Sequence, residues 1–486
     1  MPYKKIKTYL FDKNYLLFGI ILFGLIFKLL TFLNIPDLWW DSASYAGYGN
    51  FFWSFGKVGF FDVVRPPLLP LLMGFFWKIG LDSLIIGTLI QIIASTISIY
   101  LVYEISQRLF NKKGVSLIAA FLLAIDPIIF NNSQHQLTEP LAMCLALFAV
   151  LYYIKAHDSK DFSTRYLIIS GVFIALSFLT RFTFFVIFFA LLFLLISTEK
   201  IKKANEKIKK TFLFTISAIM IIIPYLIYNL FMFQNIFHPW QQVAYEMSLA
   251  GQVMDYPLTY YLTGIPEVSM IMIMAVVGLV LLLKDWKDEK NKIILLLFIL
   301  GFAYHMTLVE VKVLRYAILF LPFLIIITAY GIYSAMMHDK LLRNIMIVFL
   351  VISAFASISL DITYLKYSKT GTQEYLEKNY YNYFDKPQYY GARVMSTSPY
   401  PVALSDVRLY SLFLPNTVSL KEYESQFDSF YVMFSSVDNP CDQTLDSCKK
   451  NEGREAKAFD YIYTNYKQVQ NLTYANTNYY IFKYER

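Results

Sequence analysis

The sequence has few charged residues for its size. Asp, Glu, Lys and Arg make up 16% of the chain, apolar and aromatic residues make up 57%, and the mean hydropathy is +0.47. An ordinary soluble domain has about 25% charged residues. The shortage of charge excludes an ordinary soluble protein, because this much apolar surface has to be buried in lipid.

Cysteine is also scarce, with three residues in the whole chain. That number is too small for a disulfide scaffold, although Cys441 and Cys448 lie close together in a polar segment where a bridge would persist outside the cytoplasm. Cys144 lies in an apolar run and is interpreted as a packing residue. The polar segment from about residue 364 onward contains no Gly-rich phosphate loop, zinc-ligand spacing or nucleophile elbow.

Long apolar runs predict about eleven transmembrane helices, since about 20 helical residues cross a bilayer and unpaired backbone groups cannot face lipid. A continuous helix through Arg181 would bury this arginine near the bilayer centre, so two short spans are expected there. The predicted spans are 14–33, 84–105, 115–131, 140–156, 166–180, 182–198, 211–232, 268–284, 292–309, 316–337 and 342–361.

Basic residues predict the orientation of these helices. The net charge of +8 comes from short clusters between apolar runs, which indicates topology signals and no nucleic-acid partner. The clusters include Lys4 to Lys7, Arg108 to Lys113, Lys200 to Lys210 and Lys284 to Lys292. The positive-inside rule then predicts a multi-pass protein of the cell membrane with a cytoplasmic N-terminus, and the odd span number places the C-terminus outside.

A change in composition predicts two domains. Residues 1–363 form the transmembrane domain, and residues 364–486 form a small extracytoplasmic α/β domain with strand-like stretches such as Phe430–Phe434 and Tyr479–Lys483. Three outer regions are long or chemically unusual and are where function is expected: 34–79, 131–139 and 233–268.

Five charged residues are predicted to meet at the outer face, where each is costly unless it pairs or serves a site. The acids are Asp41, a candidate general base, and Glu139. Their alternatives are a helix N-cap for Asp41 and a favourable interaction with a helix N-terminus for Glu139. His135 is either a metal or phosphate contact or an ordinary polar loop residue.

The other three charges are Arg65, Arg181 and Arg315. The planar guanidinium group suits a phosphate, so three arginines at one membrane face would hold the phosphate of a lipid-linked donor. For any single one, lipid headgroup contact or snorkelling at a helix end is the alternative.

The order of these elements resembles the GT-C class of membrane glycosyltransferases. This class includes dolichyl-phosphate-mannose protein mannosyltransferases and lipid A aminoarabinose transferases. The resemblance covers roughly residues 15–361. It rests on Asp41 and Tyr45 in the first outer loop, the run RPPLLPLL from Arg65, Asp126-Pro127 leading to Leu137-Thr138-Glu139-Pro140, Leu179-Thr180-Arg181, and Leu314-Arg315-Tyr316 leading to Leu321-Pro322.

The resemblance implies a reaction and residue roles. A sugar would pass from a polyprenyl (dolichyl) phosphate carrier to a protein, glycan or lipid acceptor on the extracytoplasmic side, with inversion. Asp41 would be the general base, and Glu139 would assist or orient the acceptor. The donor phosphate would bind Arg65, Arg181 and Arg315, and Tyr45, His135 and Tyr316 would contact the substrates. No cofactor is expected, and a divalent metal is not favoured because no paired acidic motif is present.

This sequence departs from the mannosyltransferases in that Ser42, not an acid, follows Asp41. Two alternatives stay open. A polytopic transporter or lipid flippase would place ionisable or Gly/Pro-broken positions near the midplane, often in repeated halves, and no such repeat is found. A non-enzymatic surface protein would tolerate Asp41→Asn without loss of activity.

Overall fold

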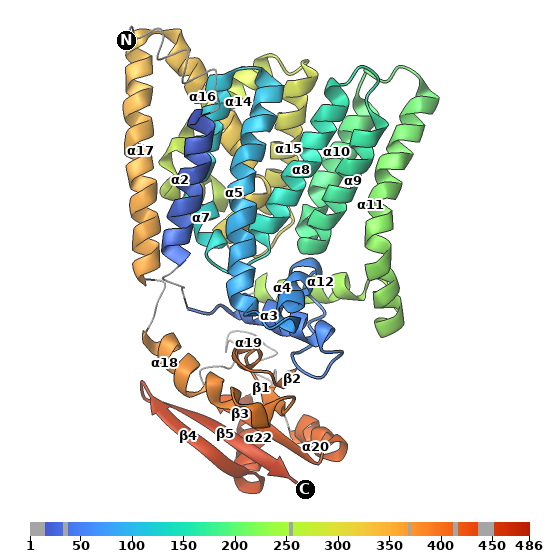
Figure 1. Cartoon of the computed structure of the whole chain (residues 1–486), viewed down its shortest axis with the longest axis vertical. Helices are drawn as coiled ribbons and strands as arrows, with labels where there is room; N and C mark the ends of the chain where they lie inside the picture. The colour runs from blue at the N-terminus through green and yellow to red at the C-terminus, as the bar shows by residue number, and fades with distance from the viewer. Residues whose placement is uncertain (1–14, 33–36, 252–255, 368–370, 412–416, 436–451) are drawn as a thin grey trace. The chain divides into compact units, whose positions relative to one another are not determined.

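The computed structural model describes residues 15–32, 37–251, 256–367, 371–411, 417–435 and 452–486 (Figure 1). The chain divides into two compact units. The helical unit comprises Met1–Ile35, Thr88–Pro239 and Tyr256–Lys366, and the sheet unit comprises Pro36–Gly87, Trp240–Asp255 and Tyr367–Arg486. Cys441, Cys448 and the N-terminal lysines lie outside the described residues.

Six described helices are long and apolar enough to cross a membrane. A seventh candidate is a bent pair, α6 (Lys113–Ala124) and α7 (Pro127–Ser133), whose axes differ by 50°. The molecule is therefore a membrane protein. The six are α2 (Tyr15–Phe32), α5 (Ser83–Phe110), α8 (Glu139–Asp158), α11 (Ala204–Phe233), α16 (Leu321–His338) and α17 (Lys340–Tyr367).

Other predicted spans coincide with shorter or less apolar helices, so the count of eleven stays a prediction. The predicted interruption at Arg181 is present, because α9 ends at Thr180 and a 3-10 turn begins at Phe182. The remaining elements of this unit are α9 (Thr164–Thr180), η1 (Phe182–Phe184), α10 (Phe185–Ser197), α13 (Tyr260–Val268), η2 (Met270–Met274), α14 (Ala275–Lys284), α15 (Glu289–Thr307) and η3 (Leu314–Leu319).

Small and hydroxyl side chains let α8 and α9 pack closely as an antiparallel pair (Figure 1). Ser177 Oγ donates to the Ala142 carbonyl and Ser170 Oγ donates to the Ala149 carbonyl, each at 2.7 Å. Such interhelical bonds compensate for the missing hydrophobic driving force between helices in lipid.

Three of the ionisable side chains buried inside the helical unit interact with one another. Lys28 of α2 is fully buried and interacts electrostatically with Asp361 of α17 and Asp126, the N-cap of α7. Asp126 also accepts hydrogen bonds from the backbone N–H groups of Ile128 and Ile129. An isolated charge is costly in this environment, so Lys28 compensates the two carboxyl groups.

We expect Lys28→Met to destabilise the protein by about 3–5 kcal/mol, because removing one partner leaves buried carboxyl groups without compensation. Thermal unfolding in detergent measures the change. The double variant Lys28→Met with Asp361→Leu is expected to recover part of the stability, since it removes the uncompensated acid as well. Equal stability of Lys28→Met and the unaltered protein would contradict this prediction.

The sheet unit contains a five-stranded sheet in the order β2-β1-β3-β5-β4. Strand β1 (Arg393–Ser396) is parallel to β2 (Arg408–Ser411) and β3 (Ser429–Ser435), whereas β5 (Thr477–Glu485) is antiparallel to β3 and to β4 (Lys467–Tyr474). The other elements are α3 (Trp40–Trp53), α4 (Leu68–Lys78), α18 (Gly371–Asn379), η4 (Tyr381–Phe384), η5 (Pro387–Tyr389), α19 (Tyr400–Leu404), α20 (Thr417–Gln426) and α22 (Glu452–Asn465); α12 (His238–Gly251) begins in the helical unit and continues here.

Side chains alternate between the two faces of this sheet, as strand geometry requires. On β1, Val394 packs with Leu376 of α18, while its neighbour Met395 packs with Ile462 of α22 on the other face. Helices therefore cover both faces of the sheet.

The segment after α3 joins the edge of this sheet. Gly59 donates its N–H to the Val407 carbonyl at 2.7 Å and accepts from the Leu409 N–H at 2.9 Å. Gly59 has a φ of +80°, and a Cβ there would lie 2.2 Å from the Gly47 carbonyl oxygen, so only glycine fits. The predicted boundary at residue 364 stays a prediction, because residues 36–87 share a compact unit with the C-terminal segment.

Candidate active site

The predicted site residues form two charged clusters, one in each unit. The base cluster consists of Asp41, Asp62 and Arg65 in the sheet unit. The arginine cluster consists of Glu139, Arg181 and Arg315 in the helical unit.

The base cluster is centred on Arg65. Its Nη2 lies 2.7 Å from Asp41 Oδ1, and its Nε lies 3.3 Å from Asp62 Oδ2. The Arg65 guanidinium carbon also lies 5.2 Å from the centre of the Tyr45 ring, within cation–π range. Asp41 lies in the first turn of α3, whose N-cap is Trp39, so the alternative that Asp41 is the N-cap is wrong.

The net charge of the base cluster does not suit the binding of a further anion such as a phosphate. Two acids face one arginine, so the cluster is negative when both are ionised. Burial raises the pKa of Asp62, and Arg65 acts in the opposite direction. The pairing suits Arg65 to holding Asp41 in place, and its predicted role as a phosphate ligand stays a prediction.

The arginine cluster lies where helices begin or end. Glu139 is the first residue of α8, Arg181 follows the last residue of α9, and Arg315 lies in the 3-10 turn η3. Arg181 Nη1 lies 3.1 Å from Glu139 Oε1, and Arg315 Nε lies 3.6 Å from the same oxygen. The Glu139 side chain is buried, whereas the side chains of both arginines are partly exposed.

Two neighbours hold these arginines in place. Tyr316 has the guanidinium carbons of Arg181 and Arg315 at 4.6 and 5.3 Å from its ring centre. Arg181 Nη1 also donates to Thr138 Oγ1 at 3.2 Å. One carboxylate against two arginines leaves a net positive charge, and this is the arrangement that suits a phosphate.

His135 is buried beside the same helix end, and its Nε2 lies 2.7 Å from the Tyr364 hydroxyl. Burial lowers the pKa of His135 to about 3, and Arg315 acts in the same direction. The imidazole is therefore neutral at physiological pH and is tied to α17. Its predicted contact with substrate stays a prediction.

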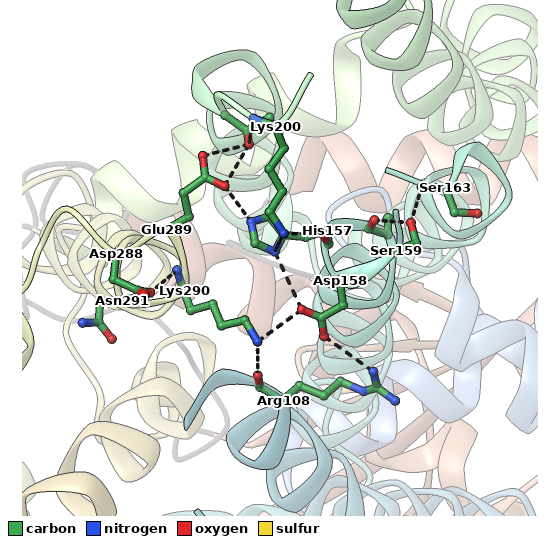
Figure 2. Close-up of polar contacts among 12 residues, drawn as sticks. Arg108, His157, Asp158, Ser159, Ser163, Lys200, Asp288, Glu289, Lys290 and Asn291 are labelled. Atoms are coloured by element: carbon green, nitrogen blue, oxygen red, sulfur yellow. Dashed lines mark hydrogen bonds and ion pairs between the residues drawn. The ribbon is translucent and has the colours of Figure 1, made fainter. Parts of the chain in front are cut away.

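A different network occupies the other end of α8 (Figure 2). His157 Nε2 lies 2.8 Å from Glu289, and Asp158 lies 3.2 Å from Lys290 and 3.6 Å from Arg108. Lys200 donates to the His157 carbonyl at 2.8 Å. Segments predicted to be cytoplasmic thus meet at one end of the helical unit, while the arginine cluster lies at the opposite end of this helix of about 30 Å.

Two residues that contact the predicted arginines were not predicted from the sequence. Asp62 pairs with Arg65, and the position of Asp62 three residues before Arg65 could have indicated this pair. Thr138 binds Arg181 from a distant part of the chain, and no local pattern indicates this contact. In the described part of the chain, no group of three or more His, Cys, Asp or Glu residues is arranged to hold a metal ion.

Comparisons with known proteins bear on the fold of this chain. Residues 64–228 match the family model of dolichyl-phosphate-mannose-protein mannosyltransferase. The structure resembles ArnT from Cupriavidus metallidurans, with a TM-score of 0.64 and 9% identity over 96% of this chain and 97% of that one. The chain therefore shares the fold of the GT-C class of membrane glycosyltransferases. The resemblance predicted from the sequence is confirmed.

Other GT-C structures are similar over most of this chain. The archaeal oligosaccharyltransferase AglB from Archaeoglobus fulgidus has a TM-score of 0.58 and 13% identity, covering 96% of this chain and 74% of that one. The arabinofuranosyltransferase AftD from Mycobacteria has a TM-score of 0.56 and 11% identity over 98% of this chain and 40% of that one. A search of curated protein sequences gives no significant match. At these identities the structural similarity establishes the fold.

The contacts of Arg65 lead to a prediction about pH. Replacing Arg65 with Gln removes the cation that favours the ionised forms of Asp41 and Asp62, so the acid limb of the rate profile is expected to move to higher pH. Arg65→Lys keeps the charge and is expected to shift the limb less. A pH–rate profile of sugar transfer measures both, and a uniform loss at every pH would contradict the positioning role.

Proposed function

We propose that this protein transfers a sugar from a polyprenyl-phosphate donor to an acceptor hydroxyl or amine on the extracytoplasmic side of the membrane, with inversion at the anomeric carbon. The observation that carries the proposal is the arginine cluster, with two arginines held on one buried glutamate at the ends of apolar helices. This is an anion site at a membrane face, the place where a lipid phosphate lies.

The donor phosphate is assigned to Arg181 and Arg315. In the reaction the bond between the anomeric carbon and the phosphate oxygen breaks, and its electron pair stays with the departing polyprenyl phosphate. Preorganised cations stabilise the charge that develops there, and such donors have large effects in sites that exclude water. Glu139 orients both arginines, and its predicted help to the acceptor stays part of the proposal.

The acceptor proton is assigned to Asp41. The acceptor oxygen or nitrogen attacks the anomeric carbon, forms the new glycosidic bond and loses its proton to the Asp41 carboxylate. Arg65 holds that carboxylate in place, and Tyr45 packs against Arg65. A single displacement of this kind inverts the anomeric centre.

The similar proteins support a lipid-phosphate donor and leave the acceptor to experiment. A structure of ArnT from Cupriavidus metallidurans, 8% identical over 97% of this chain and 98% of that one with a TM-score of 0.63, is bound to undecaprenyl phosphate. The AglB structure contains a dolichol-phosphate and an inhibitory peptide. The sugar and the acceptor are therefore best identified with panels of compounds.

The first test is sugar transfer in membranes that contain this protein, with a panel of radiolabelled polyprenyl-phosphate sugars and with protein, glycan and lipid fractions as acceptors. Transfer from at least one donor that depends on the protein is the expected result. If correctly folded protein transfers no sugar from any donor, the proposed reaction is wrong. Donor movement across the membrane without transfer would instead favour the flippase alternative.

A further inference from the structure

A polar hollow of about 130 Å³, partly open to solvent, lies in the sheet unit, and no residue of the base cluster lines it. Its walls come from α3, α4, the start of α5 and the segment around α19. The lining includes Asn50, Trp77, Asp82, Asp385 and Asp406. Asn50 and Asp41 lie on opposite sides of α3, since their spacing is about two and a half turns at about 3.6 residues per turn.

Three carboxyl groups line this hollow, and one of them, Asp82, also accepts from the backbone N–H groups of Leu84 and Ile85 at the start of α5. None of the described residues that line it is Lys or Arg, so Asp82, Asp385 and Asp406 face it without a lining cation. Asp406 is held by the Trp77 indole, whose Nε1 donates to Asp406 Oδ1 at 3.0 Å. Burial raises the pKa of Asp406, the Trp77 bond lowers it, and Asp385 raises it further. A positive ligand would relieve this repulsion.

Asn50 supplies an independent sign of a ligand. Asn50 is 4% exposed, and its Oδ1 accepts no hydrogen bond from the residues that the structure describes. A buried acceptor without a donor costs about 1–3 kcal/mol. A ligand that donates a hydrogen bond to the Asn50 Oδ1 atom would remove this cost.

We propose that this hollow binds the primary ammonium group of a ligand. An ammonium group carries three donors and a compact positive charge, which match the Asn50 oxygen and the surrounding carboxylates. An anion such as phosphate would be repelled. The described residues include no metal-binding group of three His, Cys, Asp or Glu, which makes an organic cation the better match than a metal ion. This binding does not depend on the proposed glycosyl transfer.

Calorimetric titration of the full-length protein in non-ionic detergent at low salt tests the proposal. A blocked tetralysine peptide and glucosamine represent two sources of an ammonium group, and the acetylated peptide and glucose are their neutral counterparts. Binding of the peptide, the amino sugar or both, with about tenfold or greater preference over the neutral counterpart, is expected. The compound that binds with the higher affinity identifies the source of the ammonium group.

Variants separate this hollow from the rest of the surface. Asp406→Asn keeps the acceptor for Trp77 and removes the charge, and Asn50→Leu removes the free acceptor at similar volume. Each is expected to weaken binding about tenfold or more, whereas Asp460→Asn on the exposed side of α22 leaves it unchanged. Equal binding in Asp406→Asn, equal affinity for glucose and glucosamine, or complete competition by Ca²⁺ at equal concentration would each overturn the proposal.

Discussion

Asp41→Asn is expected to reduce the rate of sugar transfer about 10²–10⁴-fold, which is the usual contribution of a general base. Asparagine has nearly the same shape and keeps an oxygen that can accept from Arg65, but it cannot take a proton from the acceptor. The loss is therefore expected in kcat, with donor binding little changed. Initial rates of transfer at saturating donor measure the effect.

Asp62→Asn is the matched control for this prediction. Asp62 also contacts Arg65, at 3.3 Å, so its substitution changes the charge of the same cluster without removing the assigned base. A loss of less than about tenfold is expected, because Arg65 then keeps its contact with Asp41. An equal loss in both variants would contradict the assignment of the base to Asp41, and full activity in Asp41→Asn would exclude it.

Arg181→Gln is expected to lower kcat/KM about 10²–10³-fold, the size of effect seen when one preorganised donor to a developing anion is removed. The substitution also leaves Glu139 with Arg315 as its remaining arginine partner in this cluster. Binding of polyprenyl phosphate is expected to weaken in parallel, because the proposed role places Arg181 against the phosphate both before and after the sugar leaves. Transfer kinetics and direct binding of polyprenyl phosphate measure the two effects.

The control lies at the other end of the same helix. Arg165 is exposed in the first turn of α9, whereas Arg181 follows its last residue. Arg165→Gln removes the same charge from the same helix and is expected to leave transfer unchanged.

The double variant Arg181→Gln with Arg315→Gln is expected to lose less transition-state stabilisation than the sum of the losses in the two single variants, since both arginines act on one phosphate. Normal polyprenyl phosphate binding in the double variant would exclude the arginine cluster as the phosphate site.

Much of the fold followed from patterns that act locally. Apolar runs of membrane length predict helices because the backbone must satisfy its own hydrogen bonds in lipid, and α2, α5, α8, α11, α16 and α17 follow these runs. The break at Arg181 also follows from the cost of a charge in lipid. The eleven-span count rests on shorter helices, where length and composition leave the decision to packing.

Asp41, Arg65, Glu139, Arg181 and Arg315 were named from the sequence because charge at a membrane face is costly and conspicuous. Sequence alone did not determine how they pair. It grouped all three arginines as phosphate ligands, whereas the structure pairs Arg65 with two aspartates and pairs Arg181 and Arg315 with Glu139. It also gave no indication of Lys28 between Asp126 and Asp361, or of the hollow beside Asn50. Each of these features joins residues far apart in the chain, and such contacts depend on how the helices and strands pack, which no local pattern encodes.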